Sequence, residues 1–173
     1  MKRYILTLII AVFALMQAAA QTYDNLWKQA DIIARKDQPR SEIGVMKKII
    51  SKASAAKDYG QLLAAEMRQM ILWKEISADS LTPNVERMEA EVLKVKDPAL
   101  KAVRYAVLGK VYSDMDEKKS QEFFKKALEQ PELLAKHTST EYVPLTLKGV
   151  DGSSFNNDLL HLIGFEADSK EAY

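Results

Sequence analysis

Residues 97–128 read DPALKAVRYAVLGKVYSDMDEKKSQEFFKKAL, and this stretch predicts two helices joined by a short turn. Its apolar residues recur at spacings of three and four, which place them on one face of a helix. They are Leu100, Val103, Val107, Leu108 and Val111 in the first half, then Phe123, Phe124, Ala127 and Leu128. Asp97 before Pro98 is a helix start, and Asp116 opens the second helix. A short connection makes successive helices antiparallel neighbours, so the stretch predicts a helical hairpin.

The same helical period precedes this hairpin and predicts four more amphipathic helices. The first helix is expected over 23–36 and ends at Asp37-Gln38-Pro39, and Ser41 caps the second. Asp58 with Gln61 opens the third helix, and Thr82-Pro83 opens the fourth. Pro131 is expected to stop the sixth. No segment alternates with period two for long enough to predict a strand. The fold class is therefore all-α, built from antiparallel helical hairpins.

Part of residues 97–128 also has a repeat-like pattern. Its members are Leu108-Gly109, Tyr112, Ser120, Phe124 and Ala127. Together they resemble one tetratricopeptide unit, in which small residues let the paired helices approach and aromatic residues fill the space between them. The match needs a one-residue deletion in the turn, where the family usually has glycine and this chain has Asp114-Met115-Asp116. The resemblance implies a right-handed stack of helical hairpins.

The start of the chain has the pattern of a signal peptide. Lys2 and Arg3 precede an uncharged apolar run over 4–16, and small residues at 18–20 suit cleavage before Gln21. The alternative is a retained membrane anchor, but an apolar run of about thirteen residues is shorter than the roughly 20 that cross a bilayer. We therefore expect a cleaved signal peptide and an exported protein, located in the periplasm, in the cell envelope or outside the cell.

Composition limits the classes of partner and chemistry. The chain has no cysteine, which excludes a disulfide framework, a thiolate metal site and a cysteine nucleophile. Lys and Arg number 25 against 24 Asp and Glu, and these charges are interspersed along the sequence. Such a pattern is typical of solvated helix faces and lacks the basic stripe that nucleic-acid binding needs. We expect no nucleic-acid partner and, after signal cleavage, no membrane span.

The chain divides into three predicted parts. These are a cleaved signal peptide over 1–20, a helical-hairpin domain over 21–137, and a loop plus short helix over 138–173. Thr, Ser and Gly in 138–154 predict a long loop, and a short helix is expected over 155–163 with Gly164 as its end. We expect the last part to be the start of a region that continues in a longer parent protein.

Residue types that could carry chemistry are few. His137 has Glu141 four residues on, His161 has Asp158 three residues back, and the two histidines fall in different segments. One histidine and one carboxylate make neither a metal site nor a catalytic triad. The run Asn156-Asn157-Asp158 lacks the spacing of a calcium loop and is interpreted as a helix start. We therefore predict no catalytic, cofactor-binding or metal-binding residue, and no cofactor.

Three further groups of residues have structural interpretations. The acids Glu86, Glu89 and Glu91 lie off the apolar stripe of their helix and predict a solvated face. A larger group of bulky side chains predicts core filling, although a hairpin stack can present some of them on a concave binding face. That group is Trp27, Trp73, Tyr105, Met46, Met67 and Met70. Asp79-Ser80-Leu81 resembles the O-glycosylation site of exported proteins of Bacteroidota, and an interhelix turn explains it equally.

Two stretches carry a second resemblance. The first is Tyr23-Asp24-Asn25-Leu26-Trp27-Lys28, continued by Ser41-Glu42-Ile43. The second joins Pro131-Glu132-Leu133-Leu134-Ala135 and Tyr142-Val143-Pro144-Leu145 to Phe155-Asn156-Asn157-Asp158-Leu159-Leu160-His161-Leu162-Ile163-Gly164. Over most of the mature chain this is similar to the N-terminal helical region of the large alpha-2-macroglobulin-like exported proteins of Bacteroidota.

This resemblance implies an accessory front domain. In that family, macroglobulin β-sandwich domains and a helical toroid follow the region, and members of the wider superfamily trap proteases, some through a cysteine–glutamine thioester. This chain has no cysteine, so trapping is carried over to none of its residues. The implied role is to dock the parent protein to the envelope or to a partner, in a protease-inhibitor or defence context.

The predicted function is thus a non-catalytic helical scaffold or interaction domain of an exported alpha-2-macroglobulin-like protein. Its expected partner is another protein or another domain of a longer parent chain. The alternative is a free-standing tetratricopeptide-like periplasmic adaptor, whose residues 138–173 would dock back on the helices. A third class, a small exported enzyme, lacks a recognisable acid, base, nucleophile or metal constellation in the sequence.

Overall fold

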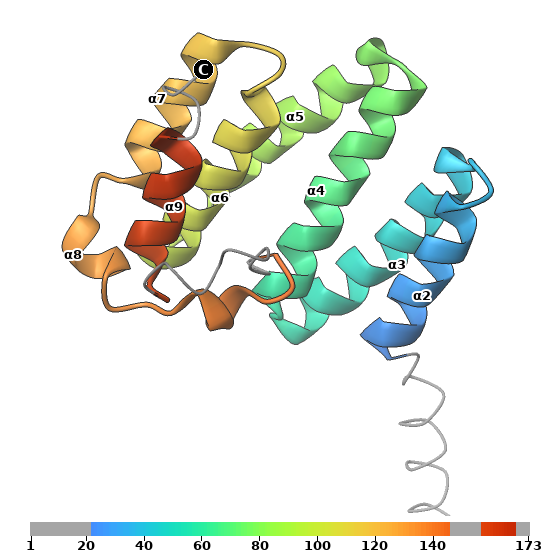
Figure 1. Cartoon of the computed structure of the whole chain (residues 1–173), viewed down its shortest axis with the longest axis horizontal. Coiled ribbons are helices and arrows are strands. Elements are labelled where there is room, and N and C mark those ends of the chain that lie inside the picture. Colours follow the sequence, from blue (N-terminus) through green and yellow to red (C-terminus); the bar gives the residue numbers. More distant parts are fainter. Residues whose placement is uncertain (1–21, 146–156, 169–173) are drawn as a thin grey trace, which may run out of the picture.

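The computed structural model describes residues 22–145 and 157–168, and in these ranges the protein is all-α (Figure 1). The helices are α2 (Tyr23–Ala34), α3 (Pro39–Ala56), α4 (Tyr59–Ile76), α5 (Ala78–Val92), α6 (Pro98–Tyr112), α7 (Glu117–Ala127), α8 (Pro131–Leu134) and α9 (Leu159–Asp168), with a 3-10 helix η1 (Ser139–Tyr142) before α9. The predicted all-α class is confirmed, and the right-handed stack of antiparallel helical hairpins stays a prediction. Within the described ranges no strand forms, and one isolated bridge joins Thr138 to Asp158.

The predicted signal peptide lies outside the described residues. In the part of the chain that the structure does describe, no helix has both the length and the apolar character needed to cross a membrane.

Neighbours in sequence are neighbours in space. Each helix from α2 to α7 packs against the next, most extensively α3 against α4 and α6 against α7. Figure 1 shows α2 to α4 on one side of the molecule and α6, α7 and α9 on the other, with α4 facing α6 across the middle. The chain then returns, because α9 lies against α6, α7 and α8.

Three groups of buried side chains hold these helices together. Leu26, Ile43, Met46, Ile49 and Leu72 join α2, α3 and α4. A second group, which includes Met70, Val85, Met88, Val107 and Leu108, joins α4, α5 and α6. A third, which includes Leu63, Val103, Phe124, Leu134, Leu159 and Ile163, ties α9 to α4, α6, α7 and α8. Helix α4 contributes to all three, so it is the element around which the molecule is built.

The α6–α7 hairpin packs as its small and aromatic residues predict. A Cβ atom on Gly109 would lie 2.8 Å from the ring of Phe124, so only glycine allows this approach. The Ser120 hydroxyl donates to the Gly109 carbonyl at 2.8 Å, and Ala127 is fully buried. Close helix packing at these positions is therefore confirmed, while the assignment of a tetratricopeptide repeat stays a prediction.

Three predicted helix starts are confirmed by their caps. The side chains of Asp58, Asp97 and Asp116 each accept a hydrogen bond from the backbone N–H three residues on, at 3.3, 2.8 and 3.0 Å. Such caps satisfy N–H groups that have no partner within the helix. The side chain of Gln61 accepts from Nε1 of Trp27 at 2.7 Å, so it ties α4 to α2.

Other predicted boundaries are wrong. Helix α3 begins at Pro39, ahead of Ser41, and Gln38 precedes it without a side-chain cap. Helix α5 begins at Ala78, which places Pro83 inside the helix instead of at its first position. Pro131 begins α8 where it was expected only to stop a helix. Helix α3 starts early because a proline suits the first helical position. The first turns of α5 and α8 bury Leu81 and Leu134, and this burial favours a helix there.

The end of the chain also differs from the prediction. In the described part of the predicted loop, η1 buries Tyr142, and Thr138 and Glu141 form a capping box. Helix α9 begins at Leu159 and continues through Gly164 to Asp168, so Gly164 is not a helix end. Phe155 and Asn156, expected to start this helix, lie outside the described residues. Contacts of α9 beyond Gly164 favour continuation of the helix, as Glu166 pairs with Lys110 at 2.6 Å.

Candidate functional site

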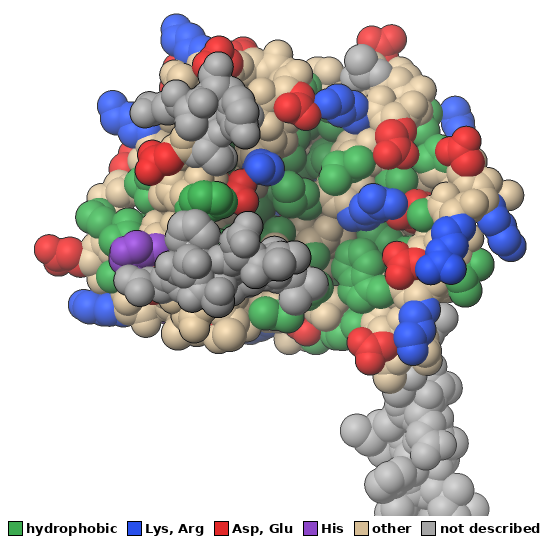
Figure 2. Space-filling view, in the orientation of Figure 1, with side chains coloured by type: hydrophobic (Ala, Val, Ile, Leu, Met, Phe, Trp, Pro, Cys, Tyr) green, Lys and Arg blue, Asp and Glu red, His purple; other side chains and the backbone are tan. Residues whose placement is uncertain are grey.

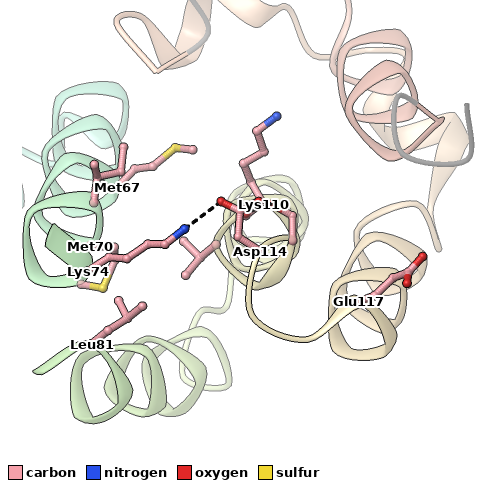
Figure 3. Close-up of a pocket in the computed structure, with 10 residues that line it drawn as sticks. Met67, Met70, Lys74, Leu81, Lys110, Asp114 and Glu117 are labelled. Carbon is pink, nitrogen blue, oxygen red and sulfur yellow. Dashed lines mark hydrogen bonds and ion pairs between the residues drawn. The ribbon is translucent and has the colours of Figure 1, made fainter. Parts of the chain in front are cut away.

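A groove of about 620 Å3 opens between α4, α5, α6 and the first turn of α7 (Figure 3). Its lining residues are Met67, Met70, Ile71, Lys74, Leu81, Lys110, Val111, Ser113, Asp114 and Glu117. Five of these residues are apolar and five are polar or charged, and the exposed ion pair between Lys74 and Asp114 lies among them. Such a mixture is typical of protein interfaces, which have an apolar centre and a polar edge.

Helix α4 provides the longest wall of the groove. Met67, Met70, Ile71 and Lys74 have the spacing i, i+3, i+4 and i+7, so they lie on one face over two turns. Met70 is buried, at 2% exposure, whereas Ile71 is 43% exposed. The α4 face that turns away from α3 therefore carries apolar side chains that the described helices cover only in part.

One ion pair crosses the groove. Nζ of Lys74 on α4 lies 3.0 Å from Oδ2 of Asp114, which follows α6 (Figure 3). Both side chains are more than half exposed. Exposed pairs of this kind contribute only about 0–1 kcal/mol to stability. The pair is therefore a weak tie across the opening, and water or a binding partner can compete for either charge.

A second cavity, of about 140 Å3, continues the hollow beneath α9. Met67 and Lys110 line both spaces, and Leu159, Leu162 and Ile163 of α9 line the second. Lys110 pairs there with Glu166 of α9 at 2.6 Å. In Figure 2 hydrophobic side chains gather in the hollow between the α4 side and the α9 side of the molecule. The groove is thus the open part of a concave apolar surface whose other part α9 covers.

The two histidine–carboxylate pairs are on neighbouring segments. Nδ1 of His137 lies 2.9 Å from Glu141, and Nδ1 of His161 lies 2.8 Å from Asp158. The Leu159 N–H donates to the His137 carbonyl at 3.0 Å, which brings together segments that the sequence separates. Among the described residues, no group of three or more His, Asp or Glu side chains is placed to hold a metal ion.

Both carboxylates in these pairs have lowered pKa values. Hydrogen bonding from His137, then from the Thr138 backbone, lowers the pKa of Glu141. For Asp158 burial raises the pKa, but hydrogen bonds from the N–H and ring of His161 outweigh burial, so the pKa is lowered. Stabilised carboxylates are poor proton acceptors. The pairs thus join the η1 and α9 segments and offer little as general bases.

The acids of α5 are only partly solvated. The prediction of a solvated face is confirmed for Glu86, which is exposed, and holds in part for Glu89 and Glu91, whose side chains are 31% and 36% exposed. Glu89 accepts a hydrogen bond from the Tyr112 hydroxyl, which also accepts from Nζ of Lys119 at 3.1 Å. Burial, then this bond to Glu89, raises the pKa of Tyr112. The cluster links α5, α6 and α7.

Of the bulky side chains expected in the core, most are there. Met46 and Met70 are buried, and Trp27, Trp73 and Tyr105 are partly buried against the core groups. Met67 instead lines the groove. In the Asp79-Ser80-Leu81 run, all three residues lie in the first turn of α5 with Leu81 buried, so an interhelix turn is the wrong interpretation.

The sequence predicts Met67, Met70 and Ile71 on one apolar helix face and Val111 on another, but it does not predict that they line a common groove. The signal that was present is the width of the first face, which also holds Leu62 and Leu63. A broad apolar face indicates a helix with more than one packing partner. No protein-family model, no curated protein and no solved structure matches the chain.

Proposed function

We propose that the protein is a non-catalytic helical interaction domain, and that it binds a segment of another protein or of a longer parent chain in the groove between α4 and α6. The observation that carries this proposal is Ile71, an isoleucine 43% exposed beside Met67 in an open apolar groove. Burying apolar surface contributes roughly 25 cal/mol per Å2, so covering this wall favours association.

The charged rim suits the same role. Lys74 and Asp114 at the opening, with Glu117 on α7, provide polar groups around the apolar floor. Rim charges influence the rate and specificity of association more than its strength. A partner segment that buries apolar side chains on Met67 and Ile71 would keep these charges at its edge, where water still reaches them.

The wider context of the proposal is an exported alpha-2-macroglobulin-like protein of the cell envelope. The sequence resemblance over the mature chain supports it, together with the signal-peptide pattern of the first twenty residues. The DNA 3′ of the codon for Tyr173 tests this context. An open frame that continues into macroglobulin-type β domains is the expected result, and an immediate stop followed by unrelated sequence would contradict it.

A second candidate function is a free-standing periplasmic adaptor, and one observation favours it. The described part of residues 138–173 packs on the helices, since Tyr142, Leu159 and Ile163 are buried against the core. The adaptor proposal expects such docking. Limited proteolysis tests it: the adaptor keeps this tail attached under native conditions, whereas rapid loss of the tail with no partner recovered would remove the candidate.

The experiment for the main proposal is crosslinking from inside the groove. A photoreactive amino acid at position 71 is compared with the same residue at position 32, because Ile32 on α2 is also exposed, at 54%, and lies outside the groove lining. Expressed in the native host, the position-71 protein is expected to capture a defined partner that the position-32 protein does not. Equal capture from both positions, or capture from neither, would refute the groove as the binding surface.

A further inference from the structure

Helix α9 shows how this concave surface holds a helix. Leu159 is fully buried and Ile163 is 4% exposed, both against α6, α7 and α8. Glu166 then pairs with Lys110 at 2.6 Å. These three residues have the spacing i, i+4 and i+7, which is one face of a two-turn helix. Two buried apolar side chains followed by a carboxylate thus form the face by which α9 contacts the protein's own surface.

The open groove beside α9 offers a wall with the same order of groups. Along α4, Met67 and Ile71 are followed by Lys74, so an apolar surface again ends at an ammonium group. From Met67 to Lys74 the helix rises about 10 Å, at 1.5 Å per residue, which matches two turns of an occupant helix. Lys110 and Met67 line both the groove and the cavity under α9, which makes the two seats continuous.

Two properties of the groove lining favour a helix as its occupant. Met67, which is only partly buried, has a flexible, polarizable side chain that adapts to the irregular surface of a bound helix. Lys74 carries three N–H donors and is 52% exposed while it pairs with Asp114. An arriving carboxylate can therefore bind Lys74 beside Asp114 without displacing it.

From this geometry we infer that the occupant of the groove is an amphipathic helix of the partner that carries the pattern of α9: an apolar residue, a second one four positions later, and a carboxylate three positions after that. The two apolar side chains cover Met67 and Ile71, and the carboxylate pairs with Lys74. This inference rests on the proposed function and specifies the partner segment.

The test uses the full chain and a fluorescent peptide with the sequence of residues 157–168, held helical by a hydrocarbon staple on its polar face. Fluorescence anisotropy is expected to show binding that Ile71→Asp weakens at least about tenfold, while Ile32→Asp leaves it unchanged. A peptide with Lys in place of its Glu is expected to bind about two- to fivefold more weakly, the effect of one exposed ion pair. Lys74→Glu should restore the binding of that Lys peptide.

Crosslinking separates the groove from the seat of α9. A photoreactive residue at position 71 should capture the stapled peptide, and one at position 106, where Ala106 lines the cavity under α9, should not. Capture only from position 106 would mean that the peptide displaces α9, and it would overturn the inference. Absence of any binding would overturn it too, as would equal binding of a linear peptide with a central proline that prevents a helix.

The two proposals fail in different ways. If the groove captures a partner from position 71 in the native host but the stapled peptide does not bind, the proposed function stands and the helical pattern is wrong. If neither the native partner nor the peptide depends on Ile71, both proposals are wrong. Circular dichroism melting of Ile71→Asp and Ile32→Asp, both at exposed positions, shows whether each variant is folded.

Discussion

At the scale of single residues, two side chains occupy backbone conformations that favour glycine. Asp37 after α2 and Lys57 after α3 have φ values of 53° and 56°. Lys57 follows the last turn of α3, and the Asp58 N–H then bonds to the Ala53 carbonyl at 2.9 Å. Left-handed residues end many helices in this way, usually as glycine, because a Cβ atom makes the conformation costly.

Lys57→Gly is therefore expected to stabilise the protein. Removing the Cβ strain at φ 56° should raise the free energy of unfolding by about 0.5–2 kcal/mol, the usual gain from an improved helix cap. Urea unfolding followed by circular dichroism measures the change. Lys52→Gly, in the interior of the same helix, is the control and should lower stability by about 1 kcal/mol. A Lys57→Gly protein as unstable as that control would contradict the backbone geometry.

Tyr142 gives the second residue-scale prediction. Burial, then the charges of Asp97 and Glu141, raises the pKa of Tyr142 to about 12. Because the ordinary value is about 10, the folded protein holds this proton more tightly than the unfolded chain does. The resulting stability is fully present below pH ~10 and is lost as the pH rises through the folded pKa.

The midpoint of urea unfolding should accordingly fall between pH 9 and pH 11, and it should fall less in Tyr142→Phe. The phenylalanine variant keeps the buried ring and removes the proton, so the difference between the two proteins isolates this group. Equal falls in both proteins would show that the Tyr142 hydroxyl is not buried as described.

At the scale of helices, a buried ion pair joins α4 to α6. Nη1 of Arg104 lies 3.3 Å from Oε2 of Glu66, and both residues are at most 9% exposed. Burial raises the pKa of Glu66, and the nearby Arg104 lowers it again without fully compensating. Among the described residues, Nε of Arg104 has no hydrogen-bond partner. Transfer of these charges from water is costly. The pair therefore fixes the position of α4 relative to α6 more than it stabilises the fold.

Replacing one member of this pair should destabilise the protein far more than replacing both. Arg104→Met leaves Glu66 buried without its partner and should cost about 3–5 kcal/mol at pH 7. The double variant Arg104→Met with Glu66→Leu should recover most of that loss, because neither charge remains in the interior. Chemical denaturation of the two variants measures the difference. A double variant as unstable as the single one would mean that the pair itself stabilises the core.

How far the sequence predicts these helices depends on whether the signal is local. The caps at Asp58, Asp97 and Asp116 depend on backbone three residues away, and all three were predicted correctly. Pro83 was misinterpreted as a helix start and Gly164 as a helix end, because the effect of each residue depends on distant partners. Helix α5 reaches back to Ala78 since Leu81 is buried, and the amide of Asn84 donates to the Ser80 carbonyl one turn before Pro83.

The groove was less predictable than the helices. It needs Met67 on α4 and Lys110 on α6 to face one space, and the 42 intervening positions give no periodic signal of that meeting. The side of α4 that faces the core was predicted because its apolar residues recur with the helical period. Ile71 is apolar like the buried residues of α4, but it is exposed. Only the packed structure shows this difference in exposure.

At the scale of the whole molecule, residues 137–145 connect the start of α4 with the start of α9. A Cβ atom on Gly60, at the start of α4, would lie 2.2 Å from the Val143 carbonyl oxygen and 2.7 Å from the Tyr142 carbonyl carbon. Backbone atoms cannot move aside as a flexible side chain can. The segment after η1 therefore lies directly against α4 because position 60 has no side chain.

Gly60→Ala should consequently loosen this segment. We expect faster hydrogen exchange at residues 139–143 and a loss of about 1–3 kcal/mol in stability, the usual cost of overpacking. Gly44→Ala is the matched control, since a Cβ atom there meets nothing within 4 Å and α3 gains helix propensity. Unchanged exchange at 139–143 in Gly60→Ala would contradict the close approach.

In residues 22–145 and 157–168 the protein is all-α, and its concave apolar surface is partly covered by α9 and, among these residues, otherwise open between α4 and α6. The central claim is that this open groove is the binding surface. The most direct measurement is calorimetric affinity for the purified partner captured from position 71, with the wild-type chain, Ile71→Asp and Ile32→Asp compared under one buffer. We predict a dissociation constant at least about tenfold weaker for Ile71→Asp and unchanged for Ile32→Asp. Equal affinities for all three proteins would contradict the claim.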